Sequence, residues 1–347
     1  MKIAIITDQH FGARKNSKLF HDYFLKFYND IFFPTLEKEG ITTVIDMGDT
    51  FDSRKAIDFS TLSWAKKNYF GRLSQMGIEL HTIVGNHTAY YKNTNDVNAI
   101  DLLLREYPNI TCYSETTEVK FDKLKTLLIP WICKENEEET FKRIKASKAK
   151  VGFGHLELNG FTATRGHVMM NGYEVDVYDK FAKVFTGHYH TRSNNGKIYY
   201  LGNPYEMFAN DTGDPRGFHI FDTETLETEE IRNPYRIFYN VYYEDDNAQT
   251  FDARQYQDKI VKLFVKKKTY PKKFEKFVDK IYAANVAELR IVENFNDVND
   301  QVDDTDIESE DTISLLNRYV EETETTLNKS QIQSLIEEVY REACELI

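Results

Sequence analysis

The chain has 347 residues, of which 41% are hydrophobic, enough for one large domain with a substantial core and smaller modules beside it. It contains no apolar stretch of about 18 residues and no hydrophobic leader after Met1, so we expect a soluble cytoplasmic protein without a transmembrane helix or signal peptide. Its three cysteines form no spaced pair, which indicates reduced thiols.

The net charge of −12 is distributed unevenly along the chain. From residue 296 to the end there are 15 acidic and 3 basic residues, which leaves 41 of each sign in the first 295. A neutral body permits local basic patches that hold phosphate groups. The acidic total therefore does not exclude an enzyme that acts on nucleic acid.

The first 87 residues alternate between strand and helix patterns. Apolar runs predict strands over residues 3–6, 42–45 and 80–84, and apolar side chains at helical spacing predict helices over 17–39 and 60–76. This alternation predicts an α/β fold of layered sheet covered by helices. Further strands are expected over 117–121, 125–132, 150–153, 184–186, 197–201 and 218–222, and further helices over 98–106 and 138–146.

Residues of metal-ligand type follow five of the predicted strands. They read Asp8-x-His10, Gly48-Asp49-x-x-Asp52, Gly85-Asn86-His87, Gly154-His155 and Gly187-His188-Tyr189-His190. Residues two apart on a strand share a face, so Asp8 with His10, and His188 with His190, should each direct two ligands to one point. Mixed His, Asp and Asn ligands suit manganese, iron or zinc, and a carboxylate such as Asp49 can bridge two ions about 4 Å apart.

In this order the five clusters resemble the motifs of the calcineurin-like metallophosphoesterases, which read D-x-H, G-D-x-x-D, G-N-H-D/E, a glycine-linked His and G-H-x-H. Within that superfamily the chain is similar over roughly its whole length to the SbcD-type nuclease subunits of double-strand-break repair complexes, above all to their phage recombination endonuclease version. The stretches that carry this similarity include Gly40-Ile-Thr-Thr-Val, Leu80-His-Thr-Ile-Val-Gly-Asn-His, Ile129-Pro-Trp-Ile-Cys, His155-Leu-Glu-Leu-Asn-Gly-Phe and Asp214-Pro-Arg-Gly-Phe. One position departs from the family, because Thr88 stands where Asp or Glu is usual.

The resemblance implies a site with two divalent ions, manganese being favoured over magnesium, iron or zinc. One ion would be bound by Asp8, His10, Asp49 and His190, and the other by Asp49, Asn86, His155 and His188. His87 would protonate the leaving oxygen or stabilise the transition state. Asp52 is expected to orient a metal-bound histidine, although a turn or helix cap is an equally simple interpretation. Thr88 cannot supply the charge of the family's acid, which puts the orientation or basicity of His87 in question.

A second pattern starts near residue 234. It consists of an apolar run over 237–243, a strand over 259–266, a helix that begins at Pro271 and ends near 284, and a strand over 286–292. This small β-α-β unit corresponds to the capping domain of the resembled nucleases. Its lysines are candidates for DNA-backbone contact, with a solvated surface as the alternative: Lys266, Lys267, Lys268, Lys272 and Lys273.

The end of the chain differs from the rest in composition. Residues 296–311 are acidic and aperiodic, which predicts a flexible linker, and residues 312–347 carry two amphipathic helix patterns. Such a pair needs a surface for its apolar stripes, either the chain's own body or a partner. In the resembled family a similar helix-turn-helix segment binds the coiled-coil base of the ATPase, and the corresponding contacts would be Ile313, Leu316, Val320, Leu335, Ile336 and Val339.

These patterns define four predicted parts: a nuclease domain (1–233), a capping, DNA-binding domain (234–295), the linker (296–311) and the helix pair (312–347). With no Walker A loop in the sequence, ATP hydrolysis would come from an SbcC-like coiled-coil ATPase subunit. The predicted function is a manganese-dependent DNA exonuclease and endonuclease that processes double-strand ends for recombination and repair by a two-metal mechanism. The resemblance also implies a homodimer, with residues 90–108 near the dimer surface, although an ordinary surface loop is an equally simple interpretation of this stretch. The expected location is the cytoplasm, that of the host if a phage encodes the chain.

Two other functions fit the same residues. A phosphatase or nucleotide phosphodiesterase of the superfamily would share every ligand, although a small substrate requires neither the lysine-rich cap nor the helix pair. A catalytically weakened scaffold subunit would bind metal and partner without turnover, and Thr88 is its only support.

Overall fold

The computed structural model describes residues 1–164, 167–246 and 250–293, together with Val320, Lys329, Ile332, Gln333 and Leu335. The chain divides into two compact units, Met1–Ile291 and Val292–Ile347. Among the described residues, no helix combines the length and the apolar character that crossing a membrane requires.

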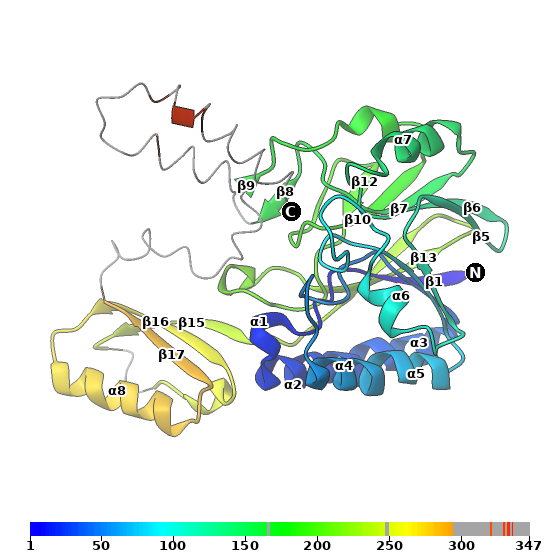
Figure 1. Ribbon diagram of the computed structural model, residues 1–347. Coiled ribbons are helices and arrows are strands. Elements are labelled where there is room, and N and C mark those ends of the chain that lie inside the picture. The colour runs from blue at the N-terminus through cyan, green and yellow to red at the C-terminus, as the bar shows by residue number, and fades with distance from the viewer. Residues whose placement is uncertain are drawn as a thin grey trace. The chain divides into compact units, whose positions relative to one another are not determined.

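Two six-stranded sheets form the centre of the first unit (Figure 1). In the first sheet the order is β14-β13-β1-β2-β3-β4, and β1 to β4 run parallel while β13 pairs antiparallel with β1. The carboxyl ends of β1, β2 and β3 therefore meet at one edge. The strands are β1 (Lys2–Ile6), β2 (Thr43–Asp46), β3 (Glu79–Ile83), β4 (Ile110–Tyr113), β13 (Gly217–Asp222) and β14 (Thr228–Arg232).

The second sheet has the order β11-β12-β10-β7-β6-β5. Its four central strands, β12, β10, β7 and β6, are parallel, so the carboxyl ends of β7 and β10 also share an edge. The strands are β5 (Thr117–Phe121), β6 (Leu124–Ile129), β7 (Val151–His155), β10 (Lys183–Gly187), β11 (Ser193–Asn194) and β12 (Ile198–Tyr200).

Three apolar cores hold these layers together. Between the two sheets, side chains such as Ile5, Ile45 and Phe153 are fully buried against one another. On its other face the first sheet packs against an aromatic-rich group of helices, and the second sheet packs against the helix α7 (Glu137–Ala146) and the 3-10 turn Val175–Tyr178. The order helix, sheet, sheet, helix confirms the predicted layered α/β fold.

The two predicted N-terminal helices are confirmed, each with a π-helical turn in its middle. The first consists of α2 (Lys18–Phe27), the turn Tyr28–Phe32 and α3 (Phe33–Glu39), and the second of α4 (Phe59–Ala65), the turn Lys66–Phe70 and α5 (Gly71–Gln75). Each turn begins or ends on large aromatic side chains that are completely buried against the first sheet. A π turn adds one residue to a helical turn, which shifts the register of the aromatic face.

The remaining elements are short. The helix expected over residues 98–106 is limited to α6 (Ala99–Leu103), which begins where the Asn98 side chain accepts a 2.9 Å hydrogen bond from the Asp101 amide. The others are α1 (Ala13–Asn16), β8 (Thr162–Thr164), β9 (His167–Val168) and the 3-10 turns Ala209–Asp211 and Arg254–Tyr256.

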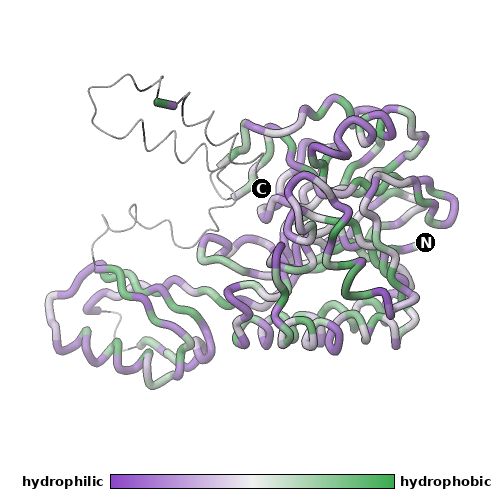
Figure 2. The backbone as a smooth tube through the Cα atoms, in the orientation of Figure 1, coloured by the Kyte–Doolittle hydropathy of each residue, from purple (hydrophilic) through white to green (hydrophobic). Residues whose placement is uncertain are grey.

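A third sheet with the order β15-β16-β17 follows, built from β15 (Phe238–Glu244), β16 (Ile260–Lys267) and β17 (Glu288–Val292). Helix α8 (Pro271–Ala283) packs on it through Phe274, Phe277 and Ile281, and hydrophobic and hydrophilic residues alternate along α8 in Figure 2. The amides of Ile237 and Phe238 both donate to the Glu206 carboxylate, which connects the start of β15 to the chain before β13. The β-α-β pattern expected here is present, while the four-part domain division stays a prediction.

Candidate metal centre

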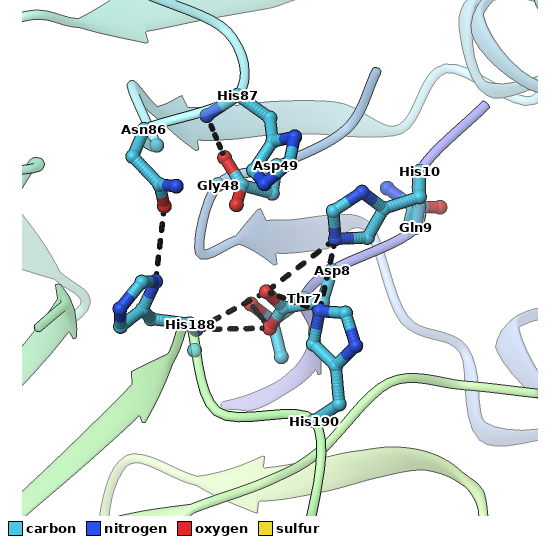
Figure 3. Close-up of polar contacts among 12 residues, drawn as sticks. Thr7, Asp8, Gln9, His10, Gly48, Asp49, Asn86, His87, His188 and His190 are labelled. Atoms are coloured by element: carbon cyan, nitrogen blue, oxygen red, sulfur yellow. Dashed lines mark hydrogen bonds and ion pairs between the residues drawn. The ribbon is translucent and has the colours of Figure 1, made fainter. Parts of the chain in front are cut away.

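The predicted ligands come together where the parallel strands of both sheets end (Figure 3). The loops after β1 and β2 stay paired beyond the strands, because the Asp8 amide donates to the Gly48 carbonyl at 3.0 Å and the His10 amide to the Asp49 carbonyl at 2.9 Å. This pairing places the Asp8 loop against the Asp49 loop. Each loop thus continues the alignment that its strand has in the sheet.

The prediction that alternation along a strand brings these ligands together is wrong. β1 ends at Ile6 and β10 at Gly187, so Asp8, His10 and His188 lie beyond the strands. These three residues have φ angles of 52°, 45° and 85°, the left-handed conformation that is rare for residues with a Cβ. Tight turns therefore direct the side chains to the site, and such turns cluster at functional sites.

The first donor group consists of Asp8, His10 and His190, whose ligand atoms all lie within 4.8 Å of one another. The Nε2 atoms of His10 and His190 are 3.1 Å apart, and each is 3.9 Å from Asp8 Oδ1. The Asp8 carboxylate is held by the Thr7 hydroxyl at 2.7 Å and by the His188 amide at 3.1 Å. A fully buried carboxylate thus faces two imidazoles.

The second donor group consists of Asp49, His155 and His188, again within 4.8 Å. Asn86 belongs with them, because its Oδ1 is 2.9 Å from His155 Nε2 and 3.0 Å from His188 Nδ1. Asp49 Oδ2 lies 3.1 Å from the same His155 nitrogen, and its Oδ1 accepts a hydrogen bond from the His87 amide at 2.8 Å. The structure therefore gathers all seven predicted ligands in two adjoining groups.

Two of the imidazoles are oriented from behind. His155 Nδ1 donates to the Met47 carbonyl at 2.8 Å, and His10 Nδ1 lies 3.1 Å from Asp52 Oδ1, so both rings present Nε2 to the donor groups. A partner on the far ring nitrogen fixes the tautomer of a ligating histidine. Asp52 thus lies against His10 Nδ1, and its role in orienting a metal-bound ring stays a prediction.

His87 lies at the edge of the first group. Its Nδ1 is 2.7 Å from the Asp52 carbonyl oxygen, and its ring meets the His10 ring edge-on with centroids 4.9 Å apart. The Thr88 hydroxyl accepts from the Gly85 amide at 2.9 Å and donates to the Gly85 carbonyl at 3.1 Å. The backbone of Asp52, rather than the side chain at position 88, therefore holds the His87 Nδ1 atom.

The imidazole rings of this site differ in pKa, because neighbouring charges raise the pKa of some rings and burial lowers the pKa of others. Burial alone would lower the pKa of His10 and of His155. The hydrogen bond that His10 donates to Asp52, together with the charges of Asp52, Asp49 and Asp8, raises the pKa of His10 to about 9. The charge of Asp49 and its hydrogen bond with His155, together with the charge of Asp8, raise the pKa of His155 to about 9. At His188, burial and the neighbouring His155 charge lower the pKa to about 3. The site thus holds protons on two of its ligands that a divalent cation would displace.

The donors fit a divalent metal ion. Imidazole nitrogen, carboxylate oxygen and amide oxygen form the mixed set that suits manganese, iron or zinc. The close donor pairs, from His155–Asn86 at 2.9 Å to His10–His190 at 3.1 Å, match the edge of about 3 Å between neighbouring ligands that bonds of about 2.1 Å produce. Both groups can therefore bind a cation with little rearrangement.

Comparison with known proteins agrees with this chemistry. A model of the calcineurin-like phosphoesterases matches residues 1–192, a range that contains all seven ligands. The chain is 35% identical over 324 residues to exonuclease subunit 1 of Enterobacteria phage T4, which covers 92% of both proteins. The chain belongs to the calcineurin-like phosphoesterase family. It is an enzyme of the hydrolase class, and the family and phage-nuclease resemblance inferred from the motifs is confirmed.

Two solved structures are more distant. An archaeal phosphodiesterase is 15% identical, with a TM-score of 0.35 over 67% of this chain and 100% of the other. A purple acid phosphatase from yellow lupin seeds is 12% identical, with a TM-score of 0.35 over 55% of this chain and 38% of the other.

A buried polar network beneath the phosphoesterase site escaped the sequence interpretation. Asp46 accepts hydrogen bonds of 2.7 Å from both Gln9 and Thr50, and burial raises the pKa of its carboxyl group to about 7. The Tyr28 and Tyr205 hydroxyls donate to the Gln9 side chain and carbonyl, each at 2.5 Å. This network fixes the turn that carries Asp8 and His10. A charged residue inside the apolar end of β2 was the available signal.

Arg216 is a further residue whose contact with the site was not predicted from the sequence. Its guanidinium is buried, donates to the His190 carbonyl through Nη1, and lies 2.8 Å from Asp211 Oδ1 through Nη2. It thereby connects the loop after β10 to the start of β13. The stretch Asp214-Pro-Arg-Gly-Phe carried part of the family resemblance, but the sequence did not predict which residues Arg216 contacts.

The remaining predicted contacts lie away from the metal centre. All five lysines proposed for DNA binding are exposed, at the end of β16 and the first turn of α8: Lys266, Lys267, Lys268, Lys272 and Lys273. Of the partner contacts, only Val320, which is buried, and Leu335, which is 60% exposed, belong to the described residues. Ile313, Leu316, Ile336 and Val339 lie outside them.

Proposed function

We propose that this enzyme is a manganese-dependent DNA nuclease that hydrolyses phosphodiester bonds with two metal ions. One observation carries the proposal: two adjoining donor groups occupy one site in a chain that is similar along 92% of its length to a phage exonuclease subunit. The similarity extends past the matched phosphoesterase range and through the lysine-bearing third sheet. A small-substrate phosphatase has no need of that extension.

The positions of the site residues suggest a different role for each group. Asp8, His10 and His190 would hold one ion and Asn86, His155 and His188 the other, with Asp49 between them. The bound ions would supply positive charge for the phosphate oxygens and lower the pKa of a water. His87 Nδ1 donates to the Asp52 carbonyl, which leaves Nε2 as the ring nitrogen that would transfer a proton to the leaving oxygen.

Three surfaces complete the proposed assembly. The exposed lysines of β16 and α8 would contact the DNA backbone. A dimer surface near residues 90–108 is supported by exposed apolar side chains, with Leu102 60% and Phe59 89% exposed, beside a shallow cavity of about 610 Å³ lined by Phe59, Leu62 and Tyr107. Residues 312–347 would bind an SbcC-like ATPase, in a cytoplasmic complex that processes double-strand ends for recombination and repair.

The test compares bis-nitrophenyl phosphate, single-stranded DNA and duplex DNA as substrates with manganese, with and without the ATPase. We expect hydrolysis of the small diester and of single strands by the chain alone, and of duplex when the ATPase and ATP are present. Turnover of the small diester without any DNA cleavage would favour a nucleotide phosphodiesterase. Bound metal without turnover of any substrate would favour the scaffold.

A further inference from the structure

The third sheet has one face that α8 covers and one that it does not. In β15 and β16 the residues Val241, Tyr243, Leu263 and Val265 are buried in the core beneath α8. Because side chains alternate along a strand, the intervening residues project from the opposite face. That open face, defined here by Asn240, Tyr242, Lys262, Phe264 and Lys266, is partly or fully exposed.

Two aromatic rings form the centre of the open face. Tyr242 and Phe264 are direct neighbours across the parallel strands β15 and β16. Their rings stack with centroids 5.3 Å apart and an interplanar angle of 20°. The Tyr242 side chain remains 46% exposed. The two rings cover one face of each other, and the pair lies at the protein boundary instead of filling a core.

Lysines lie over both rings. Lys262 Nζ is 5.5 Å from the Phe264 centroid, and Lys266 Nζ is 4.7 Å from the Tyr242 centroid. Glu244 approaches Lys266 at 3.5 Å, with both side chains almost half exposed, so this pair contributes little and leaves the lysine free to exchange partners. The open face thus combines two stacked aromatic rings with two ammonium groups.

Cross-strand aromatic pairs also stabilise small sheets, so the pair alone would be weak evidence for a ligand. The combination with lysines favours a particular ligand, because an unpaired nucleic-acid strand presents flat bases and phosphates together. Bases stack on aromatic side chains without requiring a particular sequence. A duplex keeps its bases stacked inside and offers this surface only its backbone.

We propose that the open face of the third sheet binds single-stranded DNA, with bases stacked on Tyr242 and Phe264 and phosphates contacted by Lys262 and Lys266. This inference rests on the proposed nuclease function and deepens it. It assigns the unpaired strand near a DNA end to a site different from the exposed lysines of the first turn of α8.

The test measures binding of the full-length chain in EDTA, where no cleavage occurs, to three labelled ligands of equal length: oligo(dT), an abasic oligomer with the same backbone, and a duplex. Tyr242→Leu and Phe264→Leu, singly and combined, keep apolar volume and remove the rings. Tyr282→Leu is the matched control, because Tyr282 is 58% exposed on α8, which covers the other face.

We expect wild type to bind oligo(dT) at least about tenfold more tightly than the abasic oligomer, since stacking on one aromatic ring changes affinity by about five- to 150-fold. The double variant should lose this preference and retain duplex binding, and Tyr282→Leu should retain both. Unchanged circular dichroism and thermal unfolding show that each variant is folded. If the double variant is unstable, the single variants decide, each with a partial loss.

The inference is overturned if folded variants keep the preference for oligo(dT), or if wild type binds the abasic oligomer equally well. Failure of the proposed function would be seen separately, as a wild-type chain that binds DNA in EDTA but never cleaves it when manganese is restored.

Discussion

Replacing Asp49 by Asn tests the metal centre more sharply than any other single change. The amide keeps the size of the side chain and an oxygen for the His87 amide, but it removes the negative charge 3.1 Å from His155 Nε2. We expect the variant to fold, to lose at least one of the two ions, and to lose hydrolysis of every phosphodiester.

The size of the stability effect follows from His155. Burial opposes its charge, and Asp49 is the largest of the groups that raise its pKa from 6.5 to about 9. At 1.36 kcal/mol per pKa unit this corresponds to about 3 kcal/mol, which sets the scale of the loss expected in metal-free protein. A raised pKa stabilises the fold fully below pH 6.5 and loses its effect as pH rises through about 9. The deficit of the variant should therefore be largest near pH 6 and shrink toward pH 9.

Two measurements check this prediction: metal content per chain after dialysis against manganese, and urea unfolding in EDTA at pH 6, 7.5 and 9. Asp46→Asn is the matched control, because Asp46, at the end of β2 and three residues before Asp49, is equally buried but its pKa of about 7 leaves it mostly neutral at pH 6. The control should retain both ions. Normal metal content in Asp49→Asn, or a deficit that does not change with pH, would refute the reasoning.

Three further predictions follow from the same site and from the chain end. His87→Asn should lower kcat on DNA by about 10² to 10⁴ and leave the metal content unchanged. Hydrolysis of bis-nitrophenyl phosphate should be affected much less, because nitrophenolate leaves without a proton. Steady-state kinetics on both substrates would measure this difference. Manganese affinity should rise from pH 7 to 9, because His10 and His155 must lose protons to bind it, and calorimetry in two buffers would measure the protons released. A chain that ends at Val302 should cleave single strands but fail to co-purify with the ATPase; retained co-purification, or lost cleavage, would assign the tail to the nuclease fold instead.

The sequence was most informative where hydrophobic period and ligand type coincide. Strands β1, β2 and β10 are short apolar runs that are followed within three residues by Asp8, Asp49 and His188, so the strands and the ligands are visible in the same stretches of sequence. The π turns at Tyr28–Phe32 and Lys66–Phe70 were not visible, because a one-residue insertion in a helix leaves the apolar spacing nearly helical.

The path by which ligands converge could not be predicted from spacing. The interval between Asp8 and His10 is the same on a strand and in a turn, and only their positive φ angles distinguish the two. Buried support is equally hidden: Arg216 reaches His190 across 26 residues, and Tyr205 reaches Gln9 across 196. Such contacts depend on the folded topology and leave no local pattern.

The contacts on the open face of the third sheet also depend on the folded topology. Tyr242 and Phe264 are 22 positions apart and belong to strands that are easily recognised separately. Whether they stack is decided by register, since a slip of one residue would place Tyr243 opposite Phe264 and turn one of the rings toward α8. The buried alternation of Val241, Tyr243, Leu263 and Val265 fixes that register, because any slip would expose one apolar row. The core beneath α8 therefore determines the surface above it, and a test of the stacked pair is also a test of that register.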